Sequence, residues 1–293
     1  MKRQEIRIRD PFILAYKGKY YMYGTGIPGA EDIDEGRQFW CYESRDLEEW
    51  SEPILCFDAP EDFWGEKNFW APEVHEYNGK FYLLASFIAE GHNRATQALV
   101  AEKPQGPYRV VGNPLTPSEW MCLDGTLYIE DGIPYLVFCH EWLQVKDGEI
   151  AVVPLKEDLS GAAGEATVLF SASESGWAHS FEVDDYYGIV TDGPWLVKEN
   201  DELIMFWSSY HNETYAVGMS VSESGRIAGP WRHLNELLFD KNGGHGMMFH
   251  AFDGKAYFAL HGPNDHPDER VQFFEIEKKK EGYCLVKYKK EDV

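Results

Sequence analysis

The chain has 293 residues, of which 50 are acidic and 27 are lysine or arginine, so its formal net charge is −23 at pH 7. A surface of this charge repels phosphate backbones and acidic polysaccharides, which disfavours nucleic acid and polyanionic substrates but not neutral sugars. No apolar run is long enough to span a bilayer, and residues 1–7 lack the apolar core of a secretory signal, so we expect a cytoplasmic protein that binds no membrane.

Five short apolar strands are predicted along the chain, in a unit that repeats about every 60 residues. They begin at 10–13, 71–74, 124–127, 192–195 and 245–248. A second strand is predicted after each of them, at 20–23, 81–84, 134–137, 203–206 and 256–259. Turn signals such as Lys17-Gly18-Lys19 and Asn78-Gly79-Lys80 separate the two strands, so each unit is expected to open with a hairpin.

A repeat of short strands at this spacing is typical of a β-propeller, in which the first strand of every blade lines a central channel. We therefore predict an all-β fold, a five-bladed β-propeller, as a single domain over 1–293. The blades are expected at 10–60, 70–115, 123–185, 191–240 and 244–290. Residues 1–9 are expected to pair with the last blade and close the ring, because an open ring leaves strand edges exposed. A β-sandwich is the alternative, but it would not place five equivalent strand starts around one axis.

The five cysteines are odd in number and show no CxxC spacing. This pattern favours buried, reduced thiols over disulfides or a zinc site.

Three of the five predicted strand starts carry an aspartate: Asp10, Asp124 and Asp192. If these strands surround one channel, the three carboxyl groups are far apart in sequence and close in space. Hydrolysis of a glycosidic bond needs one carboxyl group as acid and another as base or nucleophile. A neighbouring carboxylate raises the pKa of the acid, because two like charges disfavour ionisation. The pattern therefore predicts a glycosidase site.

Five motifs follow one another in blade order along nearly the whole chain: Arg9-Asp10-Pro11-Phe12-Ile13, Trp70-Ala71-Pro72-Glu73-Val74, Leu123-Asp124-Gly125-Thr126, Asp192-Gly193-Pro194-Trp195 and Gly244-His245-Gly246. In this order the sequence resembles glycoside hydrolase family 43, the five-bladed propeller family of arabinanases, arabinofuranosidases and β-xylosidases. The resemblance implies hydrolysis with inversion. It assigns Asp10 as the general base that activates water, and Asp124 as the residue that tunes the pKa of the acid and orients it.

The position of the general acid departs from the family pattern. The family usually has a glutamate before Gly-Pro in blade four, whereas Asp192, one methylene shorter, stands here. We interpret Asp192 as the acid. The alternatives are that Glu141, Glu182 or Glu73 replaces it, or that the protein is a poor or inactive hydrolase. For inversion the carboxyl groups of Asp10 and Asp192 are expected to lie about 6.5–9.5 Å apart.

Substrate and cation contacts are predicted from the remaining motif positions. Trp70 is the best platform for stacking a sugar, and Phe12 is a weaker candidate. Arg270 is expected either to reach a sugar hydroxyl or a catalytic carboxylate, or to form a structural ion pair. The resemblance implies that His245 faces the channel and helps to hold a hydrated cation, often calcium; the alternative is a histidine bonded to its neighbours. Calcium prefers oxygen ligands, so waters would have to surround a single imidazole.

The predicted function is an inverting α-L-arabinofuranosidase or arabinanase that acts on neutral, pentose-containing oligosaccharides of plant type. A cytoplasmic location favours short imported oligosaccharides and hence exo action. The alternatives are a β-xylosidase, a β-galactofuranosidase or exo-galactanase on the same fold, and a non-catalytic sugar-binding propeller. A retaining fructosidase would require an Asn-Asp-Pro-Asn-Gly opening, which Arg9-Asp10-Pro11-Phe12 does not provide. A protein-interaction scaffold would not need ordered aspartates. The oligomeric state is not predicted.

Overall fold

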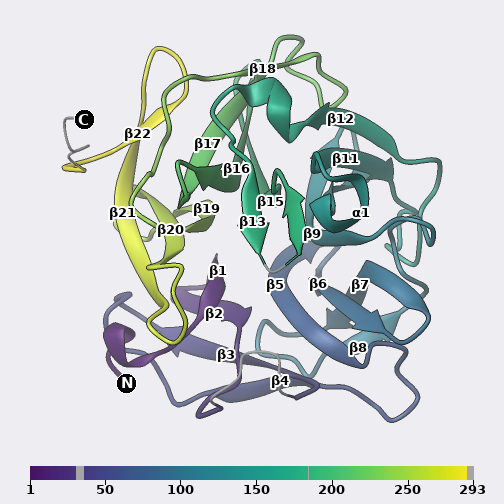
Figure 1. Ribbon diagram of the computed structural model, residues 1–293. Helices are drawn as coiled ribbons and strands as arrows, with labels where there is room; N and C mark the ends of the chain where they lie inside the picture. Colours follow the sequence, from purple (N-terminus) through teal and green to yellow (C-terminus); the bar gives the residue numbers. More distant parts are fainter. Residues whose placement is uncertain (31–35, 184, 289–293) are drawn as a thin grey trace.

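The computed structural model describes residues 1–30, 36–183 and 185–288. Its strands form five four-stranded antiparallel sheets, which surround a common axis as the blades of a propeller (Figure 1). The predicted all-β, five-bladed architecture is therefore confirmed. The single domain over 1–293 stays a prediction, because these bounds include residues that the structure does not describe.

Each blade contains four strands that follow one another in sequence from the axis to the rim. The strands of blades one and two are β1 (Arg9–Tyr16), β2 (Lys19–Thr25), β3 (Gln38–Ser44), β4 (Ile54–Asp58), β5 (Lys67–Tyr77), β6 (Lys80–Ala89), β7 (His92–Ala101) and β8 (Arg109–Val111). Those of blades three to five are β9 (Cys122–Glu130), β10 (Ile133–His140), β11 (Glu149–Pro154), β12 (Thr167–Ser171), β15 (Asp192–Glu199), β16 (Glu202–His211), β17 (Thr214–Ser222), β18 (Trp231–His233), β19 (Gly244–His250), β20 (Ala256–Gly262), β21 (Arg270–Lys278) and β22 (Tyr283–Leu285).

The hairpins between first and second strands turn where the sequence predicts. Lys17-Gly18 has φ values of 47° and 78°, and Asn78-Gly79 has 49° and 76°. Two successive positive φ angles define the type I′ turn, whose twist matches that of the flanking strands. Glycine is needed at the second position because it adopts positive φ without steric cost.

The second strands are buried on both faces, as β6 shows. Its residues Phe81–Phe87 are all buried. Phe81, Leu83, Ala85 and Phe87 pack in one cluster with blade one, while Tyr82 and Leu84 pack in another with blade three. Successive side chains of a strand point to opposite faces, so a strand enclosed between two neighbouring blades is apolar along nearly its whole length.

Every first strand begins with the same backbone bend. The residues at the bend all have positive φ: Asp10 (49°), Ala71 (47°), Asp124 (56°), Gly193 (51°) and His245 (49°). The pairing of first and second strands is irregular at each of these points. The equivalent of Asp10 in blade four is therefore Gly193, and the predicted equivalence of Asp192 with Asp10 is wrong by one residue. Asp192 instead matches Arg9, Trp70, Leu123 and Gly244 in register.

These bends connect each blade to the one before it. In four cases the backbone N–H at the bend donates to a side chain near the end of the preceding blade's second strand. The pairs are Ala71 with Thr25 Oγ1 (2.7 Å), Asp124 with Ser86 Oγ (2.9 Å), His245 with Ser208 Oγ (2.8 Å) and Asp10 with His261 Nδ1 (3.2 Å). The last pair joins blade five to blade one and so helps to close the ring.

The bend at Gly193, in blade four, departs from this rule. In the second strand of the preceding blade, Cys139 occupies the position that Thr25, Ser86, Ser208 and His261 hold in the other blades, and it pairs with Leu123. The Gly193 N–H donates instead to the carboxylate of Asp124, over 3.0 Å to Oδ2. Asp124 therefore has a structural contact in addition to any catalytic one.

Short elements complete the described chain. The N-terminal segment contains a 3-10 helix, η1 (Arg3–Glu5), and reaches blade five through a bridge between Arg7 and Arg270, which confirms the predicted contact of residues 1–9 with the last blade. A hairpin that the sequence analysis missed, β13 (Phe181–Val183) and β14 (Tyr186–Gly188), lies between blades three and four. Two single turns, α1 (Trp142–Val145) and η2 (Ala172–Ser175), account for the other helices of the described residues.

The cysteines are unpaired, as expected: all five are free, and four of them are buried. Among the described residues no helix has the length and apolar character that crossing a membrane requires.

Candidate active site

A pocket of about 290 Å³ opens on the propeller axis, where the first strands begin. The structure brings the three predicted carboxyl groups, Asp10, Asp124 and Asp192, together in it. Its other lining residues are Arg9, Thr25, Trp70, Leu123, Tyr215 and His245. Ring closure therefore gathers aspartates from blades one, three and four around one cavity.

The carboxylate of Asp10 is held by groups from blades one and five. Its Oδ2 accepts a hydrogen bond of 2.6 Å from the Thr25 hydroxyl. Its Oδ1 lies 3.3 Å from His245 Nδ1 and 3.5 Å from His261 Nδ1. Burial lowers the pKa of His261 to about 3, so this ring is neutral; its Nδ1 accepts the Asp10 N–H, and its Nε2 donates to Asn264 Oδ1 over 3.0 Å.

His245 links two of the three aspartates. Its Nδ1 lies 3.5 Å from Asp124 Oδ2 as well as 3.3 Å from Asp10 Oδ1. Asp192 is held separately, by a hydrogen bond of 2.9 Å from the Tyr215 hydroxyl to its Oδ2. Tyr215 comes from β17, the third strand of blade four, so that blade supplies both the carboxyl group and its hydrogen-bond donor.

The three buried aspartates differ in pKa. Burial would raise the pKa of Asp10, but His245, His261, Arg9 and the Thr25 hydrogen bond together outweigh it, so the pKa of Asp10 lies below its usual value. Burial, and next the charge of Asp10, raise the pKa of Asp124 well above its usual range. Burial, and next the charge of Asp124, raise the pKa of Asp192 to about 7, against the opposing effects of His245 and Tyr215. At neutral pH the pocket thus holds an ionised Asp10 beside an Asp192 that carries a proton much of the time.

Asp124→Asn is expected to shift the pH dependence of hydrolysis. The substitution removes the charge that contributes most, after burial, to the raised pKa of Asp192. The alkaline limb of kcat/KM, which reports the acid of the free enzyme, should therefore move to lower pH by about one unit. The measurement is a pH–rate profile, with Asp201→Asn, an exposed aspartate in the turn between β15 and β16, as the control. An unmoved alkaline limb would show that Asp124 does not tune the acid.

The structure places two of the predicted substrate contacts outside the pocket. Phe12 is buried in the core two residues beyond Asp10, where its ring packs against His75 and Trp195 at centroid distances of 5.3 and 5.6 Å. Arg270 does not line the pocket. Its guanidinium donates to the backbone oxygens of Gln4 (2.9 Å) and Glu269 (2.8 Å), so Arg270 fastens the N-terminal segment to blade five.

Arg9, rather than Arg270, is the arginine that lines the pocket. It lines the pocket directly beside Asp10, and its guanidinium lies 3.4 Å from the fully buried Glu269 and donates over 2.8 Å to Asn264. The sequence could have indicated Arg9 as a pocket residue through its position next to Asp10, because the irregular pairing at the bend lets two successive residues face one cavity. Thr25 and Tyr215 carried no comparable signal, since they lie on second and third strands outside the motifs.

Trp70 lines the pocket, and the Arg94 guanidinium lies over its ring at 3.9 Å. Its role in stacking a sugar stays a prediction. The candidate replacements for Asp192 do not line it. Glu141 is buried against Arg94, with Oε2 3.2 Å from Nε, and Glu73 Oε2 lies 3.0 Å from His75 Nε2. Glu182 is exposed on β13. The geometry therefore favours Asp192 over all three.

The residues around His245 do not fit a calcium ion bound directly by protein oxygens. No group of three or more His, Cys, Asp or Glu side chains that could hold a metal occurs in the described part of the chain. The Nδ1 of His245 already faces two carboxylates. A cation at this place would need waters for most of its ligands.

A five-bladed propeller whose axis gathers a low-pKa and a high-pKa carboxyl group in one pocket has the arrangement of a glycoside hydrolase. The comparison with protein families agrees, because the profile of Glycosyl hydrolases family 43 matches residues 4–278. The chain belongs to this family, and it is a glycosidase.

Several solved structures and curated proteins similar to this chain are named for activity on arabinans or xylans. The chain is similar to an endo-arabinase from Bacteroides thetaiotaomicron VPI-5482, with 38% identity, a TM-score of 0.88, and coverage of 96% of this chain and 98% of that one. An endo-1,4-β-xylanase from the same organism is 27% identical, with a TM-score of 0.75 over 96% and 94% of the two chains. The extracellular exo-α-(1→5)-L-arabinofuranosidase ArbA of Cellvibrio japonicus is 22% identical over 88% of this chain and 79% of its own.

Proposed function

We propose that the protein hydrolyses α-L-arabinofuranosyl linkages of neutral oligosaccharides with inversion of configuration. One observation carries the mechanism: the pKa of Asp10 is lowered and that of Asp192 is raised to about 7 within the same pocket. Environments that separate the pKa values of two carboxyl groups mark the base and the acid of a catalytic pair.

In the proposed reaction, water attacks the anomeric carbon while the bond to the leaving oxygen breaks. Asp10 accepts one proton of the water, and Asp192 gives its proton to the leaving oxygen, so the two carboxyl groups exchange protonation states. The Thr25 hydroxyl and the His245 imidazole hold the Asp10 carboxylate toward the pocket, and the Tyr215 hydroxyl orients Asp192. Burial and, next, the charge of Asp124 raise the pKa of Asp192 and so favour its protonated form.

The arabinofuranosyl substrate is supported by the 38% identical endo-arabinase and by ArbA. The pocket, at 290 Å³, lies near the lower end of the range of about 300–1,000 Å³ for small-molecule sites, which suits a small sugar at the reacting position. Trp70 offers it an aromatic face, and Arg9 offers hydrogen-bond donors. A β-xylan linkage is the second candidate, because the 27% identical relative is an endo-1,4-β-xylanase.

The test is hydrolysis of a panel of linear α-1,5-arabino-oligosaccharides, debranched arabinan, xylo-oligosaccharides and β-linked galactan. Proton NMR of the first-formed product should show the anomer opposite to that of the substrate, and the product lengths should separate exo from endo cutting. Retention of configuration would overturn the mechanism. Binding of arabino-oligosaccharides without release of any sugar would instead identify a non-catalytic sugar-binding propeller.

We further propose that the enzyme acts in the cytoplasm and binds neither nucleic acid nor membranes. The net charge of −23 supports the second part, because it repels phosphate backbones and anionic lipid surfaces. The five free cysteines suit a reducing compartment. The curated relatives are named extracellular, so fractionation of the native host cells is the test. Recovery of the protein from the medium would contradict the cytoplasmic location.

A hydrated calcium ion beside His245 is also a proposal, as a structural cation that takes no part in the reaction. Its support is the position of His245 at the axis, between two carboxylates from other blades. Dialysis against EDTA is expected to lower the Tm, and added calcium chloride should restore it, because an ion that binds only the folded state stabilises it. An unchanged Tm after calcium removal, verified by elemental analysis, would contradict the proposal.

A further inference from the structure

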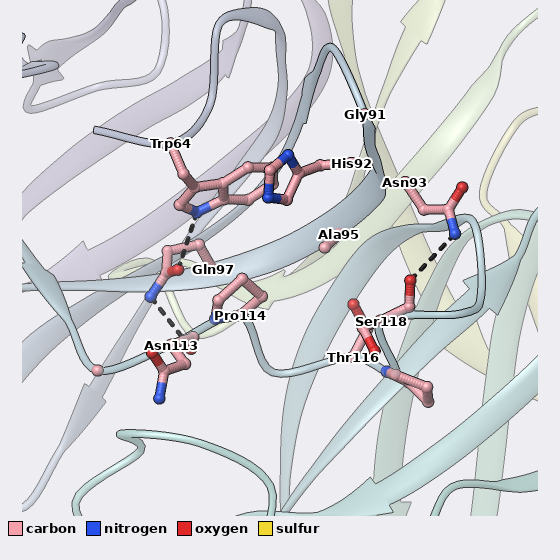
Figure 2. A pocket seen from close by; sticks show the side chains of 12 residues that line it. Trp64, Gly91, His92, Asn93, Ala95, Gln97, Asn113, Pro114, Thr116 and Ser118 are labelled. Carbon is pink, nitrogen blue, oxygen red and sulfur yellow. Dashed lines mark hydrogen bonds between the residues drawn. The ribbon is translucent and has the colours of Figure 1, made fainter. Parts of the chain in front are cut away.

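A second hollow, of about 930 Å³, lies in blade two (Figure 2) and shares no lining residue with the catalytic pocket. Its floor is the beginning of β7, its first wall is Trp64 from the segment before β5, and its second wall is the segment between β8 and β9. None of the residues assigned above to the reaction lines it.

The hollow opens on the face that carries the catalytic pocket. In an antiparallel blade the first strand begins, the second ends and the third begins at the same end of the sheet. Asp10 lies at the start of a first strand and His92 at the start of a third strand, so both lie on this face. Arg94 joins the two places: its guanidinium lies over Trp70, which lines the catalytic pocket, while its neighbours Asn93 and Ala95 line the hollow.

The chemistry of the lining favours a neutral ligand. None of the twelve described residues that line the hollow is an aspartate, glutamate, lysine or arginine, although the chain contains 50 acidic and 27 basic residues. A charged ligand would find no opposite charge there, and an anion would be repelled by the net charge of −23. The polar groups that the hollow does present are amides, hydroxyls and one imidazole, which suit hydroxyl-bearing ligands.

Trp64 forms a fixed aromatic wall. Its indole Nε1 donates over 3.1 Å to Gln97 Oε1, and the fully buried Gln97 is itself held by a hydrogen bond of 2.6 Å to the Val111 oxygen. The ring of His92 lies 6.2 Å from the Trp64 ring at 41°, which widens the platform. A rigid aromatic face gives contact area at low cost in conformational entropy, because its orientation is set before the ligand arrives.

The opposite wall is also fixed. Asn93 Nδ2 donates over 3.0 Å to the Ser118 backbone oxygen, and Figure 2 shows this bond facing Trp64 across the hollow. Thr116 Oγ1 accepts the Thr96 N–H over 3.3 Å, and the Leu115 N–H donates to the Thr96 oxygen over 2.8 Å. The segment is therefore tied to β7 at several points, and the shape of the hollow is preformed.

We propose that this hollow is an accessory sugar-binding site, which holds a stretch of the neutral arabinan chain at a distance from the bond that is cleaved. The identity of the sugar rests on the proposed function; the neutral, hydroxyl-rich character of the ligand rests on the hollow alone. The site anchors long substrates on the face where hydrolysis occurs, and short substrates that fill only the catalytic pocket do not reach it.

The test uses Trp64→Ala and His92→Ala, with Phe252→Ala as the control, an aromatic residue that is 51% exposed in the turn between β19 and β20. His92 is exposed, so its loss should leave the fold intact even if Trp64→Ala destabilises the packing around Phe63 and Phe87. Both variants are expected to weaken binding of debranched arabinan to the Asp10→Asn protein by about ten-fold, as removal of a central aromatic anchor does. In the active enzyme they should raise KM for arabinan and leave kcat/KM for p-nitrophenyl α-L-arabinofuranoside unchanged.

Equal losses on the polymer and on the aryl substrate, or no loss on either, would overturn the accessory site. The proposed function fails in a different way, by absence of arabinan hydrolysis in the unsubstituted enzyme. In that event the binding measurement is repeated with xylo-oligosaccharides and galactan. Binding that depends on Trp64 and His92 would support the accessory site with another neutral sugar, and binding that ignores both residues would overturn it.

Discussion

Asp10→Asn is expected to lower kcat for arabino-oligosaccharides by about 10²–10⁴-fold, the usual contribution of a general base. The amide preserves the size of the side chain and can still accept the Thr25 hydrogen bond, so the fold should be retained. It cannot take a proton from water, and the attacking water then stays a weak nucleophile. The measurement is steady-state kinetics of purified variants, with Asp201→Asn as the matched control.

Azide provides a sharper test of the same role. An anion needs no base to remove a proton, so sodium azide should restore turnover of Asp10→Asn on an activated aryl arabinofuranoside. The product should be the glycosyl azide with inverted configuration, since the anion enters from the face where water normally attacks. A product with retained configuration, or an undiminished rate of the variant without azide, would remove Asp10 from this role.

Asp192→Asn should have an effect that depends on the leaving group. A general acid matters most where the departing oxygen is basic, so hydrolysis of natural arabino-oligosaccharides is expected to fall by about 10²–10⁴-fold. Hydrolysis of 2,4-dinitrophenyl arabinofuranoside should fall far less, because dinitrophenolate leaves without protonation. Similar losses on both substrates would argue against Asp192 as the acid.

The pH profile gives an independent check of Asp192. Its pKa is raised to about 7, and the group must be protonated to act, so wild-type activity should decline as pH rises through about 7. The pKa of Asp10 is lowered and this group must be ionised, so the acid limb should lie below the usual range of an aspartate. Asp192→Asn should abolish the alkaline limb when assayed on the activated substrate. A limb near pH 7 that persists in this variant would belong to another group.

The blade architecture was predictable because the local sequence of each hairpin is enough to identify it. The apolar strand starts and turns such as Lys17-Gly18 recur with one period, and these signals do not depend on distant contacts. The convergence of Asp10, Asp124 and Asp192 followed from the ring itself. The repeat could not reveal which residue of each blade lies at the bend. In blade four this residue is Gly193, not Asp192, and a shift of one residue along a strand moves each side chain to the opposite face of the sheet.

The same limit explains why two predicted substrate contacts lie outside the pocket. Phe12 follows Asp10 by two residues, but regular strand pairing resumes at Phe12, and the Phe12 side chain is buried in the core. Arg270 and Glu269 are neighbours that face opposite ways, and Glu269 is the one that supports the site, through Arg9. The partners Thr25, Tyr215 and His261 come from other strands or another blade, so only the three-dimensional pairing could identify them.

The contacts of Asp10 with His245 and His261 also set an order of events in the making of the protein. Blade five follows the other four in sequence. Until it docks, the Asp10 N–H lacks its acceptor, His261 Nδ1, and the Asp10 carboxylate lacks its contact with His245. A chain whose fifth blade has not yet docked carries all three aspartates but lacks the contacts from blade five that hold Asp10. The catalytic pocket is therefore complete only once blade five has docked against blade one.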